Sequence, residues 1–230
     1  MTEILPPPLK GRCFLAAVPM RSRPSHRAEM VNQLLLDDTF DILEQEPEWS
    51  RIRCHFDGYE GWVNNLQWMP CDSSCRTATH YRTAHSPGLV AQSHYLGAPY
   101  LWGGRTTMGI DCSGLTQICF KACGISLLRD ASQQATQGEL VPSLNEAIPD
   151  DLCFFASHEN SIVHVGIYLG DNRIIHASGS VRIDTITRLG IICDSPRGCL
   201  GPDDHRLTHN LHSIRRIKPL PTTDTVPPQD

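Results

Sequence analysis

Between residues 86 and 217 the sequence changes from helical spacing to strand patterns, and this order constrains the fold more than any other feature. Ser86-Pro87 predicts a helix start, with serine as N-cap and proline at the first helical position, and Gly97 predicts its end. A second helix is expected over residues 112–123, where apolar residues recur at helical spacing and Gly124 follows. A helix pair at the front of this segment is therefore predicted.

A third, short helix and a series of strands complete the pattern. Asp130 and Gln133 have the spacing of a capping box, and Gly138 predicts the end of that helix. Runs of β-branched, aromatic and apolar residues then predict strands, at 152–156, 162–169, 173–177 and 213–217. Helices first and strands afterwards indicate an α+β domain with an antiparallel sheet.

The first seventy residues have a different character. Short apolar and aromatic runs predict strands at 14–18, 38–44, 49–54 and 61–63. Asp57-Gly58 lies between two of them and is a strong hairpin signal. The only helical pattern covers residues 27–36. The region is predicted to form a small β-barrel.

These patterns divide the chain into four parts. Residues 1–70 form the predicted barrel, 71–85 a polar linker, 86–219 the α+β domain and 220–230 a Pro- and Thr-rich tail expected to be disordered. Within the second domain, the segment 193–210 is irregular and is interpreted as an insertion.

Charge and hydropathy exclude several kinds of partner. The formal net charge is -5 and the basic residues are scattered, so nucleic-acid binding is not expected. No apolar run approaches the roughly 18 residues needed to cross a bilayer, and no signal peptide is visible at the N-terminus. Among ten cysteines, several lie in apolar runs (Cys119, Cys153 and Cys193) and are expected to be reduced and buried. Both points favour a cytoplasmic protein. The sequence does not indicate an oligomeric state.

Cys112 is the candidate nucleophile. It lies in the segment GIDCSG at the start of the second helix, where unpaired N–H groups and the helix dipole favour a thiolate. Such positions can lower a cysteine pKa from about 8.5 to about 3.5–7.5, and flanking glycines keep the expected turn open. The alternative is an ordinary buried cysteine at a helix start.

A histidine pair supplies the candidate base. In the strand 162–169, His164 lies on the face opposite Val163 and Val165, and the next strand carries His176. If the hairpin is centred on Gly170 or Asp171, the two histidines lie opposite or diagonally across on one face. A base oriented by a second polar group is the general logic of a catalytic triad. The alternative is that His164 is a satisfied core residue.

The motifs YLGAPYLWGGRTTMGIDCSG and HVGIYLGDNRIIHAS, with the order Cys…His…His, closely resemble NlpC/P60 cell-wall peptidases over residues 86–218. The motifs VPMRSRPSHRAEMVNQLL and DGYEGWV resemble the bacterial SH3-like domain that precedes some members. The resemblance implies a papain-like core in which Cys112 attacks a peptide carbonyl, His164 is the base and His176 orients it. No metal or cofactor is implied.

The resemblance also implies a substrate. It is a γ-D-glutamyl–diamino acid bond in peptidoglycan stem peptides with a free N-terminal L-alanine, the diamino acid being meso-diaminopimelate or L-lysine, in cell-wall recycling. The alternatives are a wall-peptide binding module without hydrolase activity and an acyltransferase that uses the same thioester. Nucleic acid and membrane are not expected partners.

Seven further positions match substrate-contacting residues of similar proteins. The resemblance places the substrate amine at Glu29, Tyr59 and Asp130, where carboxylates and a phenol can bind an ammonium. It places other contacts beside the nucleophile, at Asp111, Ser113, Tyr100 (toward the oxyanion) and Trp102 (a cleft wall). The structural alternatives are an N-cap for Asp130, a solvated helix carboxylate for Glu29, and packing for Tyr59 and Trp102.

The sequence departs from similar proteins at two places, and it offers one alternative functional site. Ala131 stands where similar proteins often have serine, and Asp150-Asp151 where they often have Gly-Asp. Aspartate tolerates left-handed turns, so the fold is expected to survive. The rival is a zinc site in the linker with a loosely metal-like spacing, formed by Cys71, Cys75, His80 and His85.

Overall fold

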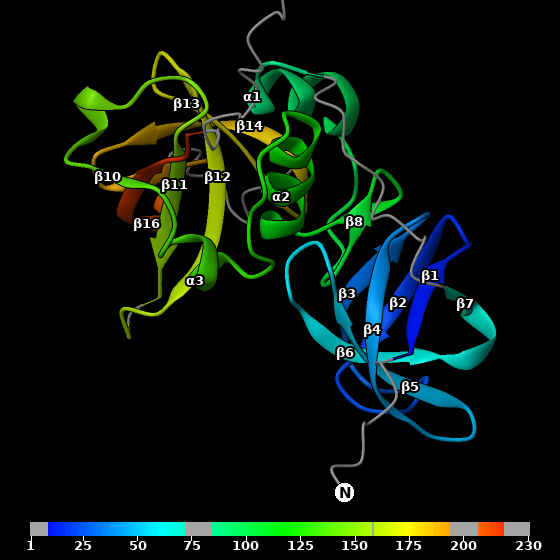
Figure 1. The fold of residues 1–230 in the computed structure, drawn as a ribbon. Helices are drawn as coiled ribbons and strands as arrows, with labels where there is room; N and C mark the ends of the chain where they lie inside the picture. The colour runs from blue at the N-terminus through cyan, green and yellow to red at the C-terminus, as the bar shows by residue number, and fades with distance from the viewer. Residues whose placement is uncertain (1–8, 72–83, 158, 194–206, 219–230) are drawn as a thin grey trace, which may run out of the picture.

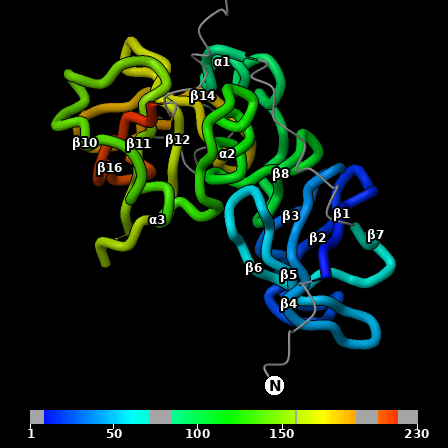
Figure 2. Tube along the Cα trace, in the orientation of Figure 1, coloured from blue at the N-terminus to red at the C-terminus, as the bar shows by residue number. Residues whose placement is uncertain are grey.

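The computed structural model describes residues 9–71, 84–157, 159–193 and 207–218. Two units lie side by side: a small barrel built from the first strands, and a larger unit in which three helices pack on a strongly curved sheet (Figure 1; Figure 2). In the described residues no helix is long and apolar enough to cross a membrane.

The N-terminal unit is a seven-stranded antiparallel sheet in the order β3-β2-β6-β5-β4-β1-β7. Its strands are β1 Lys10–Cys13, β2 Ala17–Arg21, β3 Met30–Leu35, β4 Thr39–Gln45, β5 Trp49–Cys54, β6 Glu60–Asn64 and β7 Trp68–Cys71, with a 3-10 turn η1 at Asn65–Gln67. Met20, Leu34, Phe40 and Ile52 are fully buried between these strands. The expectation of a β-barrel is confirmed, and β7 extends it to Cys71.

Two predictions in this unit were wrong. The expected strand at 14–18 is replaced by β1 and β2 on either side of a turn at residues 14–16. Residues 27–36, which have a helical pattern, include strand β3 instead of a helix. The alternate residues Asn32 and Leu34 are buried, and the backbone of β3 forms its hydrogen bonds with β2. The hairpin at Asp57-Gly58 is confirmed, and Gly58 adopts the positive φ of 71° that this turn requires.

The C-terminal unit begins with its helices. They are α1 Pro87–Val90, continued by a π-helical turn η2 at Ala91–Tyr95, then α2 Cys112–Ala122 and α3 Ala131–Gln134. Ser86 caps α1 by accepting a hydrogen bond from the Leu89 N–H, as expected. A short ribbon of β8 Arg105–Thr106 and β9 Gly109–Ile110 leads into α2.

The strands of this unit form a second seven-stranded sheet in the order β10-β16-β11-β12-β13-β14-β15. They are β10 Glu139–Val141, β11 Leu152–Ala156, β12 Ile162–Gly170, β13 Arg173–Ser178, β14 Ser180–Thr187, β15 Gly190–Ile192 and β16 Leu207–Arg216, with a 3-10 turn η3 at Leu144–Glu146. Because β16 pairs with both β11 and β15, strands β11 to β16 close into a barrel. The predicted antiparallel α+β architecture is confirmed.

The sequence patterns missed part of this sheet. β10, β14 and β15 were not predicted, because their runs are short or mix polar residues with apolar ones. The last strand begins at Leu207, so residues 207–210, interpreted as part of an irregular insertion, are strand. The rest of that segment from 194 to 206, most of the predicted linker and the predicted tail lie outside the described residues.

The two faces of this sheet pack differently. One face meets the helices, where Leu115 and Phe120 of α2 pack against Val165 and Ile167 of β12. The other face lines the barrel interior with Phe155, Tyr168, Ile174, Ile186 and Ile214. β12 is therefore buried on both sides, and it joins the helix layer to the barrel interior.

Buried charges fix the two units to each other. Arg105 is 2% exposed and donates through Nη1 to the Gln33 carbonyl at 2.7 Å and to Asp38 Oδ2 at 3.2 Å. Lys121 reaches Asp38 Oδ1 at 3.2 Å, and Gln117 reaches Asp57 at 2.9 Å. Both α2 and the β8–β9 ribbon thus contact the N-terminal barrel through buried polar groups.

The cysteines divide into two groups. Cys119 and Cys153 are free and fully buried, as expected. Cys71 and Cys193 are disulfide-bonded, so the expectation that Cys193 is a reduced thiol in a strand was wrong, and it follows β15 instead of lying in it. Disulfides persist in oxidising compartments. The cytoplasmic location therefore loses part of its basis and stays a prediction.

Candidate active site

Cys112 is the first residue of α2 and faces strand β12. Asp111 is the N-cap and accepts a hydrogen bond from the Gly114 N–H at 2.6 Å, which fixes the helix start. Cys112 is 6% exposed, and its thiol hydrogen bonds with the backbone of Val165, the residue after His164. The nucleophile candidate is therefore held against the strand that carries the base candidate.

The electrostatics of Cys112 correct the prediction from sequence. Burial, with a contribution from Asp111, raises the pKa of the thiol to about 12, and backbone hydrogen bonds of Val165 and Ser113 offset this only in part. The helix start was expected to lower this pKa in an exposed turn. Burial outweighs the helix dipole here because desolvation disfavours the charged form more than a few N–H groups favour it. The free site holds a neutral thiol.

A cavity of about 440 Å³ opens beside the thiol and is shared by both units. The N-terminal barrel contributes Glu29, Val31 and Tyr59 to its wall. The C-terminal unit contributes Trp102, Asp111, Cys112, Ser113, Asp130, Ala131, Ser132, Ile162 and Val163. Six of the seven positions matched by resemblance thus line one cavity with Cys112, although they are spread from residue 29 to residue 130. The seventh, Tyr100, is not among the lining residues.

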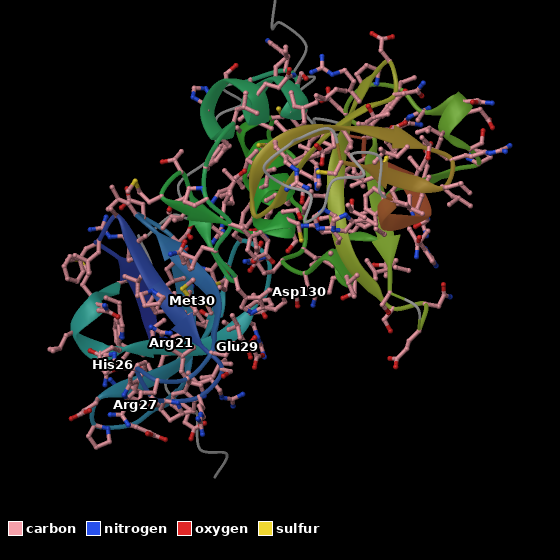
Figure 3. All side chains as sticks on the ribbon, turned by 180° about the vertical axis from the view of Figure 1, so that it is seen from behind. Arg21, His26, Arg27, Glu29, Met30 and Asp130 are labelled. Carbon is pink, nitrogen blue, oxygen red and sulfur yellow. The ribbon has the colours of Figure 1, made fainter. Side chains whose placement is uncertain are left out.

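Two of the carboxylates that line the cavity are Glu29 and Asp130. Glu29 and Asp130 both lie at the boundary of the two units (Figure 3). Burial, with Asp111 and Asp57 nearby, raises the pKa of Asp130 despite the opposing effect of Arg129. Burial beside Asp130 also raises the pKa of Tyr59 to about 12. Asp130 also forms the predicted capping box with Gln133, so its N-cap and cavity positions coexist.

Trp102 and Glu29 form a contact between the units. The indole Nε1 of Trp102 donates to Glu29 Oε1 at 2.7 Å. Trp102 is 58% exposed and lines the cavity, so it is a cleft wall and not a core residue. Glu29 precedes β3, which removes the alternative that it is a helix carboxylate.

Asp111 and Ser113 are held by protein partners. Arg129 is 1% exposed and donates to both Asp111 oxygens, at 3.1 and 2.6 Å, and to Ser113 Oγ at 2.9 Å. Its Nε donates to Asn32 of the N-terminal barrel at 2.8 Å. The Gly103 N–H also donates to Asp111, at 2.8 Å. Asp111 therefore organises the main chain around the nucleophile.

The two predicted histidines are bonded to each other. His164 Nε2 lies 2.8 Å from His176 Nδ1, and His176 Nε2 lies 3.0 Å from Asp184 Oδ2. β12 and β13 pair with Gly166 opposite His176, which places His164 diagonally across the hairpin, as predicted. We refer to His164, His176 and Asp184 as the imidazole row. All three are at most 5% exposed.

A third histidine covers the first. The rings of His209 and His164 stack with centroids 4.2 Å apart and planes at 26°. Burial, together with the neighbouring His176, lowers the pKa of His164 well below its ordinary value. Burial lowers the pKa of His176 as well, and lowers that of His209 to about 4. These rings are therefore neutral near pH 7.

The thiol of Cys112 and the ring of His164 are not directly bonded: no hydrogen bond joins them among the described residues. Neither His164 nor His176 lines the cavity. Catalytic hydrogen bonds are often long before substrate binds. Tyr100 lies close enough to Cys112 that burial together with the thiolate charge raises the pKa of its hydroxyl.

The zinc alternative loses a donor. Cys71 is disulfide-bonded and so cannot serve as a thiolate ligand. Cys75 and His80 lie outside the described residues. Within the described residues, no group of three or more His, Cys, Asp or Glu side chains has the geometry to hold a metal ion.

A thiol at the start of a buried helix, beside a strand with a paired histidine, is an arrangement that cysteine peptidases use. Comparison with protein families agrees: residues 97–191 match the NlpC/P60 family and residues 20–66 match the bacterial dipeptidyl-peptidase SH3 domain. The chain therefore contains an NlpC/P60 domain preceded by a bacterial SH3-like domain.

Individual relatives agree with this family. A γ-D-glutamyl-L-lysine dipeptidyl-peptidase of Bacillus subtilis is 45% identical over 98 residues, which is 40% of this chain and 33% of the relative. A γ-DL-glutamyl hydrolase of the same organism is 41% identical over 110 residues, 47% of this chain and 27% of the relative. The matches thus span about a third or less of these relatives.

Among solved structures, an NlpC/P60 family protein from Bacillus cereus superposes with a TM-score of 0.47 at 21% identity. The match covers 91% of this chain and 63% of that chain.

Residues that sequence reasoning missed lie behind the predicted ones. Arg129 and Asn32 hold Asp111, and Arg182, Asp184 and His209 surround the histidines. One signal was present for Asp184: a single residue, Gly179, separates the two alternating segments, so a hairpin pairs Asp184 with Ile174, on the same face as His176. Nothing in the sequence pattern pointed to His209.

Proposed function

We propose that the protein is a cysteine endopeptidase that hydrolyses γ-D-glutamyl–diamino acid bonds in peptidoglycan stem peptides with a free N-terminal L-alanine. One observation carries the proposal: the Cys112 thiol and the carboxylates of Glu29 and Asp130 line a single cavity. A thiol at one point and acidic groups at another fit a short substrate that ends in an ammonium. The names of the B. subtilis relatives support the γ-glutamyl bond.

The reaction starts from a neutral thiol and a neutral imidazole. His164 takes the proton of Cys112 as sulfur attacks the γ-carbonyl of D-glutamate, forming a tetrahedral intermediate. We assign donation to its oxyanion to N–H groups at the start of α2 and to the hydroxyl of Tyr100, which lies near Cys112. His164 then gives the proton to the departing amine of the diamino acid. Water, activated by the same ring, releases L-alanyl-γ-D-glutamate from the thioester.

The acidic end of the cavity supports selection for a free amine. A carboxylate pair stabilises an ammonium, whereas an acylated nitrogen leaves the carboxylates buried beside a neutral group and adds bulk against the barrel wall. Asp130 is half-buried, so an uncompensated charge there costs free energy. Ala131 replaces a hydroxyl that similar proteins often carry, and the next residue, Ser132, also lines the cavity. Such specificity suits the recycling of short wall fragments.

The test is mass spectrometry of L-Ala-γ-D-Glu-meso-diaminopimelate and the L-lysine analogue after incubation with the protein. We expect the wild type to release the free diamino acid and Cys112→Ala to release none. An N-acetylated copy should be at least about tenfold slower, because a lost charge-assisted contact costs roughly 1.5–3 kcal/mol. Equal cleavage of the acetylated copy would overturn selection for the free amine.

Other outcomes would redirect the assignment. Product formation only with an added amine would indicate acyl transfer. Cleavage of poly-γ-glutamate but not of the stem peptides would keep the γ-glutamyl bond and remove peptidoglycan as the substrate. Tight peptide binding by wild type, without any product, would indicate a wall-peptide binding module.

A further inference from the structure

We propose that Asp184 is a positioning residue that sets, through His176, which ring nitrogen of His164 is free to act as the base. The inference rests on the proposed function, because it assigns a role in the same site. Asp184 is 1% exposed on β14. The register with β13 pairs Asp184 with Ile174 and Arg182 with His176, so Asp184 lies diagonally across from His176 on the same face.

The argument follows the direction of each hydrogen bond. A carboxylate accepts only, so the 3.0 Å contact to Asp184 requires a proton on His176 Nε2. Burial raises the pKa of Asp184, but hydrogen bonds from His176 and Arg182 outweigh it and the pKa is lowered, so the acceptor stays ionised. Neutral His176 then has a bare Nδ1. The 2.8 Å contact between the rings therefore requires a proton on His164 Nε2.

The consequence is a lone pair on His164 Nδ1. This nitrogen is the one nearer to the main chain, and the Cys112 thiol hydrogen bonds with the main chain of the next residue, Val165. The tautomer dictated by Asp184 thus directs the basic nitrogen to the thiol side. Without the carboxylate, both tautomers of His176 satisfy the ring-to-ring contact, and part of the population would present a protonated Nδ1.

Arg182 holds the carboxylate in this role. Its Nε donates to the same Oδ2 at 2.8 Å, and its Nη1 donates to the Ser178 carbonyl. Titratable groups surround the imidazole row: His176 comes from β13, Arg182 and Asp184 from β14, and His209 from β16. On the α2 side, Cys112 bonds to the main chain of Val165, the residue after His164. Asp184 is the one anion among the side chains of this set in the described residues. It therefore also stabilises the imidazolium formed when His164 takes the proton.

Two variants separate the two effects. Asp184→Asn keeps an oxygen that can accept from His176 Nε2, and Arg182 Nε holds that oxygen in place, but the charge is lost. Asp184→Ala removes both. A matched control is Asp151→Asn, since Asp151 is also 1% exposed and is bonded to Arg216 at 2.8 and 2.7 Å. It lies beside Tyr168 just before β11 begins, whereas the imidazole row lies toward the other end of β11, where Phe155 pairs with His164.

The first measurement needs no substrate. Imidazole ¹⁵N NMR of histidine-labelled protein near pH 7 should show protonated Nε2 and bare Nδ1 for both His164 and His176, assigned with His176→Gln. We expect Asp184→Ala to mix the tautomers and Asp184→Asn and Asp151→Asn to preserve them. A protonated Nδ1 on His164 in the wild type would overturn the proposal without any variant having to fold.

The second measurement is the rate of Cys112 alkylation by iodoacetamide across pH, followed by peptide mapping. We expect Asp184→Ala to slow alkylation about 10–100-fold, the usual effect of removing an outer-shell orienting group. Asp184→Asn should move the acidic limb to lower pH, because loss of the anion makes the imidazolium harder to form. Equal slowing by Asp184→Ala and Asp151→Asn would show that Asp184 is only structural. The NMR and alkylation measurements use no peptide substrate, so they test the role of Asp184 even if the proposed peptide is not a substrate. Failure of this proposal can therefore be distinguished from failure of the proposed function.

Discussion

Two buried carboxylates organise the two halves of this site, and they do so differently. Asp111, on the thiol side, accepts from two main-chain N–H groups and from Arg129. Asp184, on the imidazole side, has side-chain donors, His176 and Arg182. A carboxylate bonded to main chain fixes a loop and a helix start, whereas one bonded to a ring fixes a proton. We infer that Asp111 belongs mainly to the fold and Asp184 mainly to the chemistry.

The largest expected effect tests the structural half of this comparison. Arg129→Met removes the counter-charge of Asp111 and leaves that buried carboxylate unpaired, which costs about 3–5 kcal/mol of unfolding free energy. Urea denaturation measures it. The matched control is Arg216→Met, whose partner Asp151 is equally buried but whose own side chain is 30% exposed, so water can replace it. An equal loss in both variants would contradict the structural role of Asp111.

A smaller effect concerns pH and the imidazole half. The pKa values of His164, His176 and His209 are lowered in the folded state. Below about pH 6.5 the unfolded chain takes up protons that the folded rings do not, so stability falls as pH falls. For each ring that stays neutral in the folded state, the loss is about 1 kcal/mol between pH 6.5 and 5.5. Denaturation curves at a series of pH values measure it.

Replacement of the rings sharpens the same prediction. His176→Gln should remove about a third of this pH dependence, the share of one ring among His164, His176 and His209. The exposed residue His212 provides the control, and His212→Gln should leave the slope unchanged. A stability that does not vary from pH 7 to 5.5 would show that the rings are not held neutral.

The smallest expected effect lies at the contact between the units. Trp102→Phe keeps an aromatic cleft wall but removes the indole donor to Glu29. With the carboxylate free to move, we expect KM for the free-amine peptide to rise about 3–10-fold and kcat to change less than twofold, consistent with roughly 1 kcal/mol for one hydrogen bond. Glu48→Gln, an exposed carboxylate of the same barrel away from the cavity, serves as control. A fall in kcat at constant KM would place Trp102 in the chemical step.

The sequence was sufficient where a residue's role depends on local pattern. The helix caps at Ser86 and Asp130, the hairpin at Asp57-Gly58 and the face shared by His164 and His176 follow from spacing alone, and the structure confirms them. Glu29 and Asp130 were placed together by resemblance, and the cavity contains both. Their roles toward substrate stay predictions.

Features that depend on tertiary packing could not be predicted from the sequence. The helix start favours a thiolate at Cys112, but tertiary packing buries the thiol and raises its pKa instead. The pattern at 27–36 permits a helix, but pairing with β2 makes Met30–Leu35 a strand. His209 reaches His164 only because β16 closes the barrel, a long-range pairing that no local pattern reports.

The proposed thioester on Cys112 is the central claim, and rapid quenching tests it most directly. L-Ala-γ-D-Glu-meso-diaminopimelate is mixed with protein, quenched with acid within milliseconds, and the Cys112 peptide is weighed by mass spectrometry. We expect the mass of an L-alanyl-γ-D-glutamyl group on Cys112, absent in Cys112→Ala and lost on a timescale that matches product release. Product formation with no acyl group on Cys112, or with the group on another residue, would contradict the assignment of the nucleophile.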